Sequence, residues 1–381
     1  MNKFIWALLC LTLTAATTAY AQNNTSTTTT SSTTTLTAAG TVAQWLHALH
    51  ANTSNKIMLQ LPDGSSVQGD VRYSLTNNGS MHLQGAIDGM QGASFSIDIT
   101  DNQLQGRIMM PHSYKAYVYS NDAAGNVHLA AADIRKLLCV DFAEGDEAGN
   151  TGQKPTNDPD VSSLQSNPGA GGCLLLDFDG YDMPAGNYWN MGQAISAAAS
   201  GMSSADMLVA WQIVSEDFYP FNLNVTTSEA VFATYPQNKR SRCVVTPTNY
   251  FFPNCAGIAF TGSFTFQNEA PCWIFTSGTG LTGKRVGEAS SHELGHTLGL
   301  SHDGAAGTDY YFGHGNWASI MGNSLSKPVT QWSKGEYAGA TNTEDDLAVI
   351  AGATNGVGYR TDDYGGTFAT ATALLQVGGV L

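Results

Sequence analysis

One stretch of the chain, 292–303, constrains the protein more than any other feature of its sequence. It reads His-Glu-Leu-Gly-His-Thr-Leu-Gly-Leu-Ser-His-Asp. On a helix, residues four apart share a face, so His292 and His296 can direct their imidazoles to one point. Gly299 can take the positive φ that ends a helix, which lets the chain turn back and bring in His302. Three imidazoles that leave one position open are the arrangement of a catalytic zinc site.

Glu293 follows His292 directly and therefore projects beside the metal position. A carboxylate there could act as the general base for a water molecule activated by the metal. The alternative is that these are ordinary histidines on a helix surface, because short motifs recur by chance. The longer pattern fixes five positions of the sequence, which makes coincidence far rarer than for the two-histidine motif alone.

The charge of the chain argues against some classes of partner. Its 381 residues carry a formal net charge of -15 at pH 7, and no basic run is present. Such a chain lacks the lysines and arginines that neutralise phosphates, so we expect neither nucleic acid nor a membrane surface as its partner. With 42% hydrophobic residues, it is long enough for a core-bearing domain and further segments.

The first residues have the pattern of a secretory signal peptide. Lys3 precedes an apolar run from Phe4 to Leu13, and Ala19-Tyr20-Ala21 has the small-x-small form of a cleavage site. The apolar run is too short to cross a bilayer. We therefore predict that residues 1–21 are a signal peptide and that the protein is secreted, with an uncleaved membrane anchor as the alternative.

Changes of composition divide the region from 22 to 172. Residues 22–55 are rich in Thr and Ser, which predicts a disordered tether, and a short helix is expected around Val42 to Leu49. Residues 56–142 alternate short apolar runs with Asp-Gly and Asn-Asn-Gly turns, which predicts a small β-rich domain. Residues 143–172 are rich in Gly, Asn, Pro and Asp, a composition typical of an exposed linker that a protease can cut.

The pattern from 173 to 355 predicts an α+β domain. Two longer segments, 204–218 and 283–300, predict helices, and short apolar runs predict strands. The predicted strands lie at 173–178, 221–227, 243–246, 256–261 and 273–276. Strands that alternate with long helices favour a mixed, twisted sheet with helices packed on it.

Met321 makes a resemblance to a known family specific. It follows the third histidine in the sequence Ser319-Ile320-Met321-Gly322. A zinc signature of this length followed by such a methionine resembles the metzincin zinc metalloproteases. Asp303, directly after His302, is similar to the reprolysin (adamalysin) branch. The resemblance implies a metzincin catalytic domain over 173–355, with a zinc helix and a Met-turn in which Met321 lies beneath the metal. Met321 could also be an ordinary core residue, and the two interpretations are compatible.

Further segments add to this resemblance. Gly257, Ile258 and Ala259 resemble the edge strand above the metzincin cleft, to which a peptide substrate adds as an extra antiparallel strand. An ordinary interior strand is the alternative. Thr330-Gln331-Trp332-Ser333 resembles the start of the family's last helix. Asp303 could support a zinc ligand as a second-shell carboxylate, although Asp-Gly is also an ordinary turn.

The resemblance implies a secreted zinc metalloendopeptidase that acts on proteins or peptides. His292, His296 and His302 would hold one Zn²⁺, and Glu293 would be the general base that accepts a proton from water. The alternative is a catalytically inactive, zinc-stabilised adhesion or binding module. Glu293 favours the enzyme, because a module that needs only three histidines has no use for a base.

The cysteines suggest that the enzyme is made as a latent zymogen. Cys10 leaves with the signal peptide, so five remain, and an odd number in an exported protein leaves one thiol unpaired. Cys139 stands at the end of the β-rich domain, just before the linker. It resembles the cysteine switch of latent metalloproteases, in which a propeptide thiolate occupies the open zinc position. Residues 56–142 would then be an inhibitory propeptide. A buried structural cysteine, or a bridge to another segment, is the alternative.

The remaining cysteines and an acidic cluster allow weaker expectations. Two disulfides, in any of three pairings, could join Cys173, Cys243, Cys255 and Cys272. Asp177, Asp179 and Asp182 could hold Ca²⁺, but their spacing lacks the full calcium-binding loop, which favours a strand that ends in a polar turn. Residues 356–381 resemble the opening of a bacterial pre-peptidase C-terminal domain, a β-sandwich module of secreted proteases.

Overall fold

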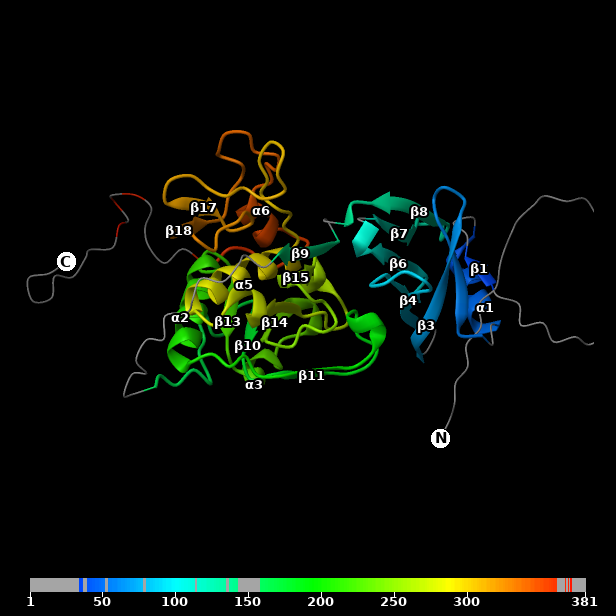
Figure 1. Ribbon diagram of the computed structural model, residues 1–381, viewed down its shortest axis with the longest axis horizontal. Coiled ribbons are helices and arrows are strands. Elements are labelled where there is room, and N and C mark those ends of the chain that lie inside the picture. The colour runs from blue at the N-terminus through cyan, green and yellow to red at the C-terminus, as the bar shows by residue number, and fades with distance from the viewer. Residues whose placement is uncertain are drawn as a thin grey trace, which may run out of the picture.

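The structure, a computed structural model, describes residues 34–36, 40–51, 54–77, 80–113, 115–134, 137–142 and 158–361, together with 367, 369 and 371. The predicted signal peptide therefore lies outside the described residues, as do most of the Thr/Ser-rich tether, the first half of the linker and most of the C-terminal tail. Two β-sheets organise the described chain, one at each side of Figure 1.

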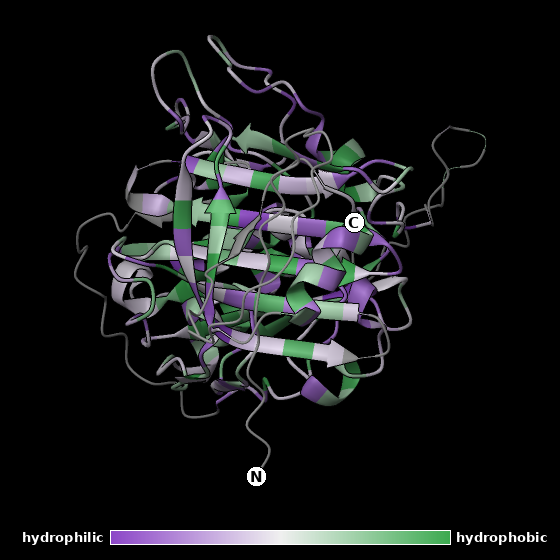
Figure 2. Cartoon of the chain, turned by 90° about the vertical axis from the view of Figure 1, so that its right-hand side faces the viewer, coloured by the Kyte–Doolittle hydropathy of each residue, from purple (hydrophilic) through white to green (hydrophobic). Residues whose placement is uncertain are grey.

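The N-terminal sheet has eight strands in the order β1 to β8. All neighbours are antiparallel except β1 and β2, which run parallel. Its strands are β1 (Thr34–Leu36), β2 (Lys56–Gln60), β3 (Ser66–Asn77), β4 (Ser80–Ile87), β5 (Ser94–Thr100), β6 (Gln103–Met110), β7 (Lys115–Asn121) and β8 (Val127–Ala132). Buried residues alternate with less buried ones along β2 and β5, because successive side chains of a strand point to opposite faces. Figure 2 shows the same interleaving of hydrophilic and hydrophobic residues.

Helix α1 (Val42–Ala51) covers one face of the N-terminal sheet. Val42, Trp45 and Leu49 are buried there in a core with the apolar side chains of the strands. The Trp45 ring meets the Tyr119 ring edge-on, with ring centroids 5.1 Å apart. The Tyr119 hydroxyl donates a hydrogen bond to the Gln60 carbonyl oxygen (2.6 Å). The helix lies where the sequence predicts one, and it closes the core of the β-rich domain.

The second sheet has six strands in the order β13-β10-β14-β16-β15-β9. Its strands are β9 (Leu138–Phe142), β10 (Gly172–Asp177), β13 (Leu223–Thr226), β14 (Arg240–Thr246), β15 (Cys255–Phe260) and β16 (Cys272–Phe275). The first four in this order run parallel, whereas β15 is antiparallel to β16 and β9 is antiparallel to β15. The last strand of the β-rich region thus forms the edge of the sheet in the other half of the molecule (Figure 1).

Two long helices pack on each other and on one face of this sheet, namely α2 (Ser204–Asp217) and α5 (Gly283–Thr297). The Ser203 hydroxyl caps α2 by accepting a hydrogen bond from the Asp206 amide. A Cβ added to Gly287 of α5 would lie 3.0 Å from Ile213 Cβ. The two helices can therefore approach closely because position 287 lacks a side chain.

The opposite face of the sheet carries a second, aromatic core. Trp273 and Phe275 of β16 and Phe260 of β15 are buried there with Trp189. The covering segment includes the short antiparallel strands β11 (Tyr181–Met183) and β12 (Ile195–Ala197). Helix α3 (Glu229–Phe232) lies further along this face, where Phe232 packs on Cys173 and Leu175.

The C-terminal region contains the parallel strands β17 (Trp317–Ser319) and β18 (Val329–Gln331) and the helix α6 (Asp346–Ala351). The expectation of a helix start at Thr330–Ser333 is wrong, because the β18 backbone pairs with β17 instead. Short helical turns complete the described chain: α4 (Thr276–Thr279), Pro111–Ser113, Asn190–Gly192, Gln237–Lys239 and Ser263–Thr265. The protein is thus a mixed α+β molecule.

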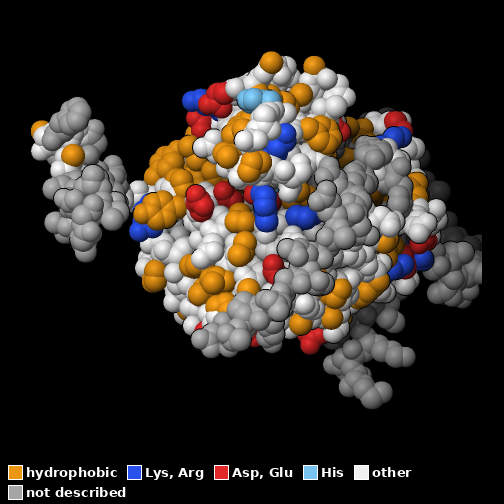
Figure 3. Space-filling model, turned by 60° about the vertical axis from the view of Figure 1, so that its left-hand side comes forward, with side chains coloured by type: hydrophobic (Ala, Val, Ile, Leu, Met, Phe, Trp, Pro, Cys, Tyr) orange, Lys and Arg blue, Asp and Glu red, His pale blue; other side chains and the backbone are white. Residues whose placement is uncertain are grey.

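The surface carries charges of both signs. On the face drawn in Figure 3, acidic and basic side chains are interspersed among apolar ones. Within the described residues, no helix combines the length and the apolar character needed to cross a membrane.

Candidate metal site

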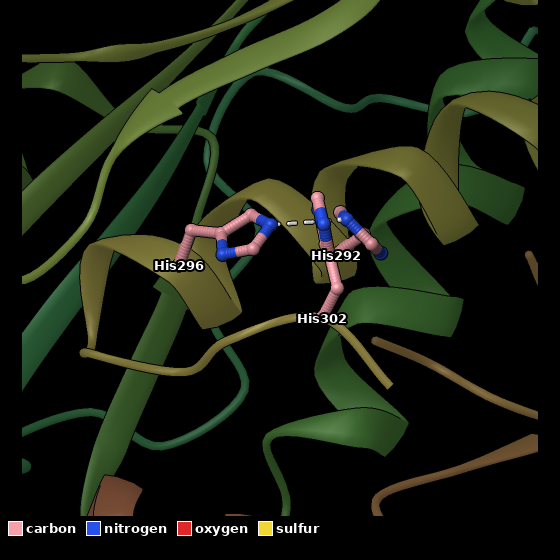
Figure 4. A group of neighbouring side chains, drawn as sticks. All are labelled: His292, His296 and His302. Carbon is pink, nitrogen blue, oxygen red and sulfur yellow. Dashed lines mark hydrogen bonds between the residues drawn. The ribbon is translucent and has the colours of Figure 1, made fainter. Parts of the chain in front are cut away.

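Three histidines converge at the C-terminal end of α5 (Figure 4). One ligand atom from each of His292, His296 and His302 can be chosen so that all lie within 4.8 Å of one another. The Nε2 atoms of His292 and His296 are 3.1 Å apart. Helix α5 ends at Thr297, and Gly299 follows with φ of 104°. This left-handed conformation, which glycine adopts readily, turns the chain so that His302 faces the two helical imidazoles.

Backbone carbonyls orient the two helical imidazoles. His292 Nδ1 lies 2.7 Å from the Ile320 carbonyl oxygen, and His296 Nδ1 lies 2.8 Å from the Leu300 carbonyl oxygen. A carbonyl oxygen can only accept, so each Nδ1 carries a proton and each Nε2 faces the space between the two rings. Burial, together with His302 and His292, lowers the pKa of His296 well below its ordinary value. The two rings therefore direct their Nε2 atoms toward one point, where a cation could bind both.

Glu293 follows His292 on α5. Its side chain is fully buried on α5. A Cβ added to Gly257 of β15 would lie 2.4 Å from Glu293 Oε1, so the carboxylate passes directly against the backbone of this strand. The structure therefore brings together the predicted base and the predicted substrate strand, and only glycine at position 257 leaves room for both.

Met321 occupies a tight turn that contacts α5. The Gly322 amide donates to the Ser319 carbonyl oxygen (3.1 Å), which closes the turn. A Cβ added to Gly295 of α5 would lie 2.7 Å from the Met321 sulfur. Met321 is fully buried in the core on which α2 and α5 pack. Because Ile320 of the same turn accepts the hydrogen bond from His292, the turn both supports the helix and orients the His292 ring.

Asp303 is fully buried next to the third histidine. Its amide donates to the Met321 carbonyl oxygen (2.8 Å), and its own carbonyl oxygen accepts from the Tyr311 amide (2.7 Å). Burial raises the pKa of the Asp303 carboxyl to about 6. Carbonyl oxygens, rather than this carboxylate, hold Nδ1 of His292 and His296. In the described structure, the backbone of Asp303 thus links the His302 loop to the turn that contains Met321.

Tyr310 is a neighbour of the site that the motif does not predict. Its ring centroid lies 4.2 Å from that of His302 and 6.2 Å from that of His292. Tyr310 belongs to the loop between His302 and β17, where no periodic pattern marks one residue over another. The contact of Tyr310 with the histidine rings depends on the fold of this loop. The sequence shows that an aromatic residue is present there, but it does not predict the contact.

Strand β9 places the backbone of Cys139 opposite the predicted substrate strand. Cys139 pairs with Ala259, and Asp141 pairs with Gly257. Strand β15 is therefore an interior strand in this chain, and it would be the edge of the sheet without β9. The side chain of Cys139 lies outside the described part of the chain, so the cysteine switch stays a prediction.

The cysteines of the second sheet differ from the expectation of two disulfides. Among the described residues, no disulfide joins Cys173, Cys243, Cys255 and Cys272. Cys243 and Cys272 are register partners on neighbouring strands and point into the core beneath α2 and α5. Cys173 and Cys255 belong to two separate apolar clusters. Burial raises the pKa of the Cys272 thiol well above its ordinary value. Dense apolar packing thus accounts for these cysteines without covalent bonds.

The predicted calcium cluster has other partners. Asp177 forms an ion pair with Arg242 (2.6 Å), which also binds Glu229 and Glu269. Asp182 accepts a hydrogen bond from the Ser196 hydroxyl (2.6 Å). In the part of the chain that the structure describes, the three histidines are the one group of this kind whose ligand atoms gather closely enough to hold a metal. The carboxylates of Asp177, Asp179 and Asp182 do not form such a group.

Comparison of the sequence with protein-family models and with curated proteins finds no match.

Proposed function

We propose that this chain is a zinc-dependent endopeptidase of the metzincin type, similar in its site to the reprolysin branch, and that it is made as a latent precursor. Its substrates would be proteins or peptides. Residues 173–355 of the mixed α+β fold would form a metzincin catalytic domain, in which α5 is the zinc helix.

The observation that carries the proposal is the pair of Nε2 atoms of His292 and His296, which are 3.1 Å apart. Each ring directs Nε2 into the shared space because a carbonyl oxygen accepts a hydrogen bond from the opposite ring nitrogen. One ligand atom of His302 lies within 4.8 Å of those of the other two histidines. Two imidazoles from one helix and a third from the following loop suit the ligand preference of Zn²⁺. His292, His296 and His302 would hold the ion.

Glu293 is suited to the proton transfers of peptide hydrolysis. When zinc is bound at such a site, it lowers the pKa of a water molecule and polarises a carbonyl group. Glu293 would accept the proton that this water loses and would deliver it to the leaving amine. Its position against Gly257 sets the carboxylate beside β15, whose backbone groups could hold an extended peptide by antiparallel pairing.

Strand β9 supports the proposal of latency. It is antiparallel to β15 and uses the hydrogen-bonding edge that a peptide substrate would need. Residues 56–142 would therefore be a propeptide that inhibits its own catalytic domain until the linker 143–172 is cut. Cys139, whose backbone lies in this strand, would supply a thiolate to the open metal position.

We also propose that the protein is secreted. Residues 1–21 would be removed as a signal peptide, and residues 356–381 would begin a pre-peptidase C-terminal domain. Mass spectrometry of the protein recovered from the culture medium would test the first point, because it gives the mass of the mature N-terminus. An intact Met1 on the recovered protein would contradict it.

Casein hydrolysis tests the enzyme against the alternative of a binding module. The full chain is loaded with zinc and cut in its linker by an added serine protease, which is then inhibited. We expect hydrolysis that a chelator abolishes and that added zinc restores. Bound zinc at one ion per chain without any hydrolysis would support the zinc-stabilised binding module instead.

A further inference from the structure

An aromatic cavity lies beside the Phe260 end of β15, outside the metal site. Its volume is about 450 Å³. Six aromatic residues of the second half of the chain line it, namely Tyr188, Trp189, Tyr250, Phe251, Phe252 and Phe260. The residues that close it from the N-terminal half include Met109 and Leu138. The wall formed by the second half would thus become accessible if the N-terminal half left.

Contacts within the second half of the chain hold much of the aromatic wall. Trp189 Nε1 donates to the Pro271 carbonyl oxygen (2.9 Å), and the Trp189 amide donates to Asn187 Oδ1 (2.8 Å). The ring centroid of Phe260 lies 4.4 Å from that of Trp189 and 6.0 Å from that of Tyr188. The Tyr188 ring also meets His82 of β4 edge-on, with ring centroids 5.8 Å apart. The Trp189 side of the wall is thus held within the second half of the chain, whereas the Tyr188 side also packs on the N-terminal half.

The backbone after Trp189 is strained, which suggests that the shape of this loop has a function. Asn190 and Met191 have φ of 47° and 54°, in the left-handed region that residues with a Cβ rarely adopt. Such strain tends to occur where a binding surface needs a particular backbone shape. Trp189 and Tyr188 are presented to the cavity by this loop.

Leu138 shows what kind of side chain the cavity takes. It is the first residue of β9, pairs with Phe260, and is buried in the same apolar cluster as Trp189. Asp141 of β9 pairs with Gly257, against which Glu293 lies. Leu138 therefore precedes Asp141, the β9 residue whose pairing partner Gly257 lies against Glu293. A peptide that replaced β9 in the same direction would place an earlier residue, on the amino side of the cleaved bond, in the position of Leu138.

We propose that this aromatic cavity is a substrate subsite that binds a bulky apolar side chain on the amino-terminal side of the cleaved bond. This inference rests on the proposed peptidase function and names its substrate class. An aromatic wall gains free energy by covering an apolar side chain, whereas a carboxylate placed there would lose its hydration. Leucine or phenylalanine should therefore be preferred over alanine, and alanine over aspartate.

Matched peptides test the subsite without altering the protein. The zinc-loaded full chain, cut in its linker as above, is given peptides that differ only at one residue on the amino side of the cleaved bond. The positions one to four residues before that bond are scanned with Leu, Phe, Ala and Asp. At one of these positions we expect kcat/KM about tenfold higher for Leu or Phe than for Ala, and lower still for Asp.

A variant links the preference to the cavity. Tyr188→Ser should reduce the Leu-over-Ala ratio, whereas Tyr219→Ser, which alters an exposed aromatic residue outside the cavity, should leave it unchanged. Thermal melting checks that both variants fold. Cleavage with equal rates for Leu, Ala and Asp at every scanned position would overturn the subsite and leave the peptidase standing, and the cavity would then serve only to seat the N-terminal half. Failure to cleave any peptide or casein would overturn the proposed function and the subsite with it.

Discussion

At the scale of single residues, the site depends on a division of roles along one turn of α5. His292 and His296 direct Nε2 outward because the Ile320 and Leu300 carbonyl oxygens hold Nδ1. Glu293, between them, lies on another side of the helix against Gly257. The residue that would move a proton is thus separate from the residues that would hold the metal. This separation predicts that the two roles can be removed independently.

Glu293→Gln should abolish catalysis and leave metal binding intact. The amide is nearly the same size as the carboxylate but cannot accept a proton, so hydrolysis should fall by roughly 10²–10⁴-fold. Zinc content, measured by mass spectrometry of the metal, should stay at the wild-type level. Glu336→Gln, at an exposed position, is the control and should retain activity. Loss of zinc from Glu293→Gln would contradict the role of this residue as a base.

Asp346 should make stability depend on pH. Burial raises the pKa of its carboxyl from 3.8 to about 8. Below about pH 4 the group is neutral in both the folded and the unfolded chain. As pH rises towards 8, the unfolded chain releases this proton while the folded chain retains it, so stability falls across this window and stays lower above it. The carboxyl thus favours folding at low pH.

Asp346→Asn removes this titration. The melting temperature of this variant minus that of wild type should increase as pH rises from 4 to 8. The corresponding gain in the free energy of unfolding is on the order of a few kcal/mol. The exposed Glu336→Gln should show no such trend. A difference between Asp346→Asn and wild type that is constant over this pH range would disprove the argument.

At the scale of elements, α2 and α5 form the support of the site. Position 287 leaves little room for a side chain, because a Cβ there would lie 3.1 Å from both the Cα and the carbonyl oxygen of Ala210. Helix α5 carries two of the three histidines and Glu293. Any change that separates the two helices should therefore also disturb the metal site.

Gly287→Val tests this packing. Overpacking between the helices should lower the free energy of unfolding by about 1–3 kcal/mol, measured by chemical denaturation. Gly40→Val is the control, because a Cβ at Gly40 would meet other atoms only at 3.4 Å or more. Equal stability of Gly287→Val and wild type would show that the two helices are not tightly packed at this position.

Leu138→Asp tests whether β9 keeps the chain latent. Leu138 is 6% exposed, so a carboxylate at this position would lose its hydration and weaken the pairing of β9 with β15. We expect the zinc-loaded variant to hydrolyse casein without any cut in the linker, whereas wild type should need the cut. Ser120→Asp, on the exposed side of β7, should behave as wild type. A latent Leu138→Asp chain would rule out this strand as the inhibitory element.

Local patterns in the sequence predict much of these elements. The histidine spacing indicates α5, although the helix ends at Thr297, before the predicted limit, because the chain bends at Gly299. The carbonyl partners of the histidines and the ring of Tyr310 could not be predicted, because they come from separate loops. The helix expected at Thr330 is a strand because Val329–Gln331 finds a partner in β17, a long-range contact that overrides local preference. The cysteine spacing likewise does not reveal which sheet face each thiol occupies.

At the scale of the whole molecule, one strand joins the two halves. Strand β9 follows the N-terminal sheet in the sequence and pairs with β15 of the second sheet (Figure 1). The same strand sets Leu138 in the aromatic cavity and the Cys139 backbone opposite Ala259. Under the proposed function, the N-terminal half would block the edge of β15 that binds a peptide and, through Cys139, the metal. The two modes of inhibition are separable, because Cys139→Ser would remove only the thiolate.

The central claim is that His292, His296 and His302 hold zinc, and X-ray absorption at the zinc edge of the full chain tests it most directly. We predict one zinc ion per chain, with imidazole nitrogens at about 2.0–2.1 Å, and loss of this signal in His296→Ala. A sulfur ligand at about 2.3 Å that disappears in Cys139→Ser would support the predicted cysteine switch. Zinc well below one ion per chain, or the same imidazole signal in His296→Ala, would contradict the account.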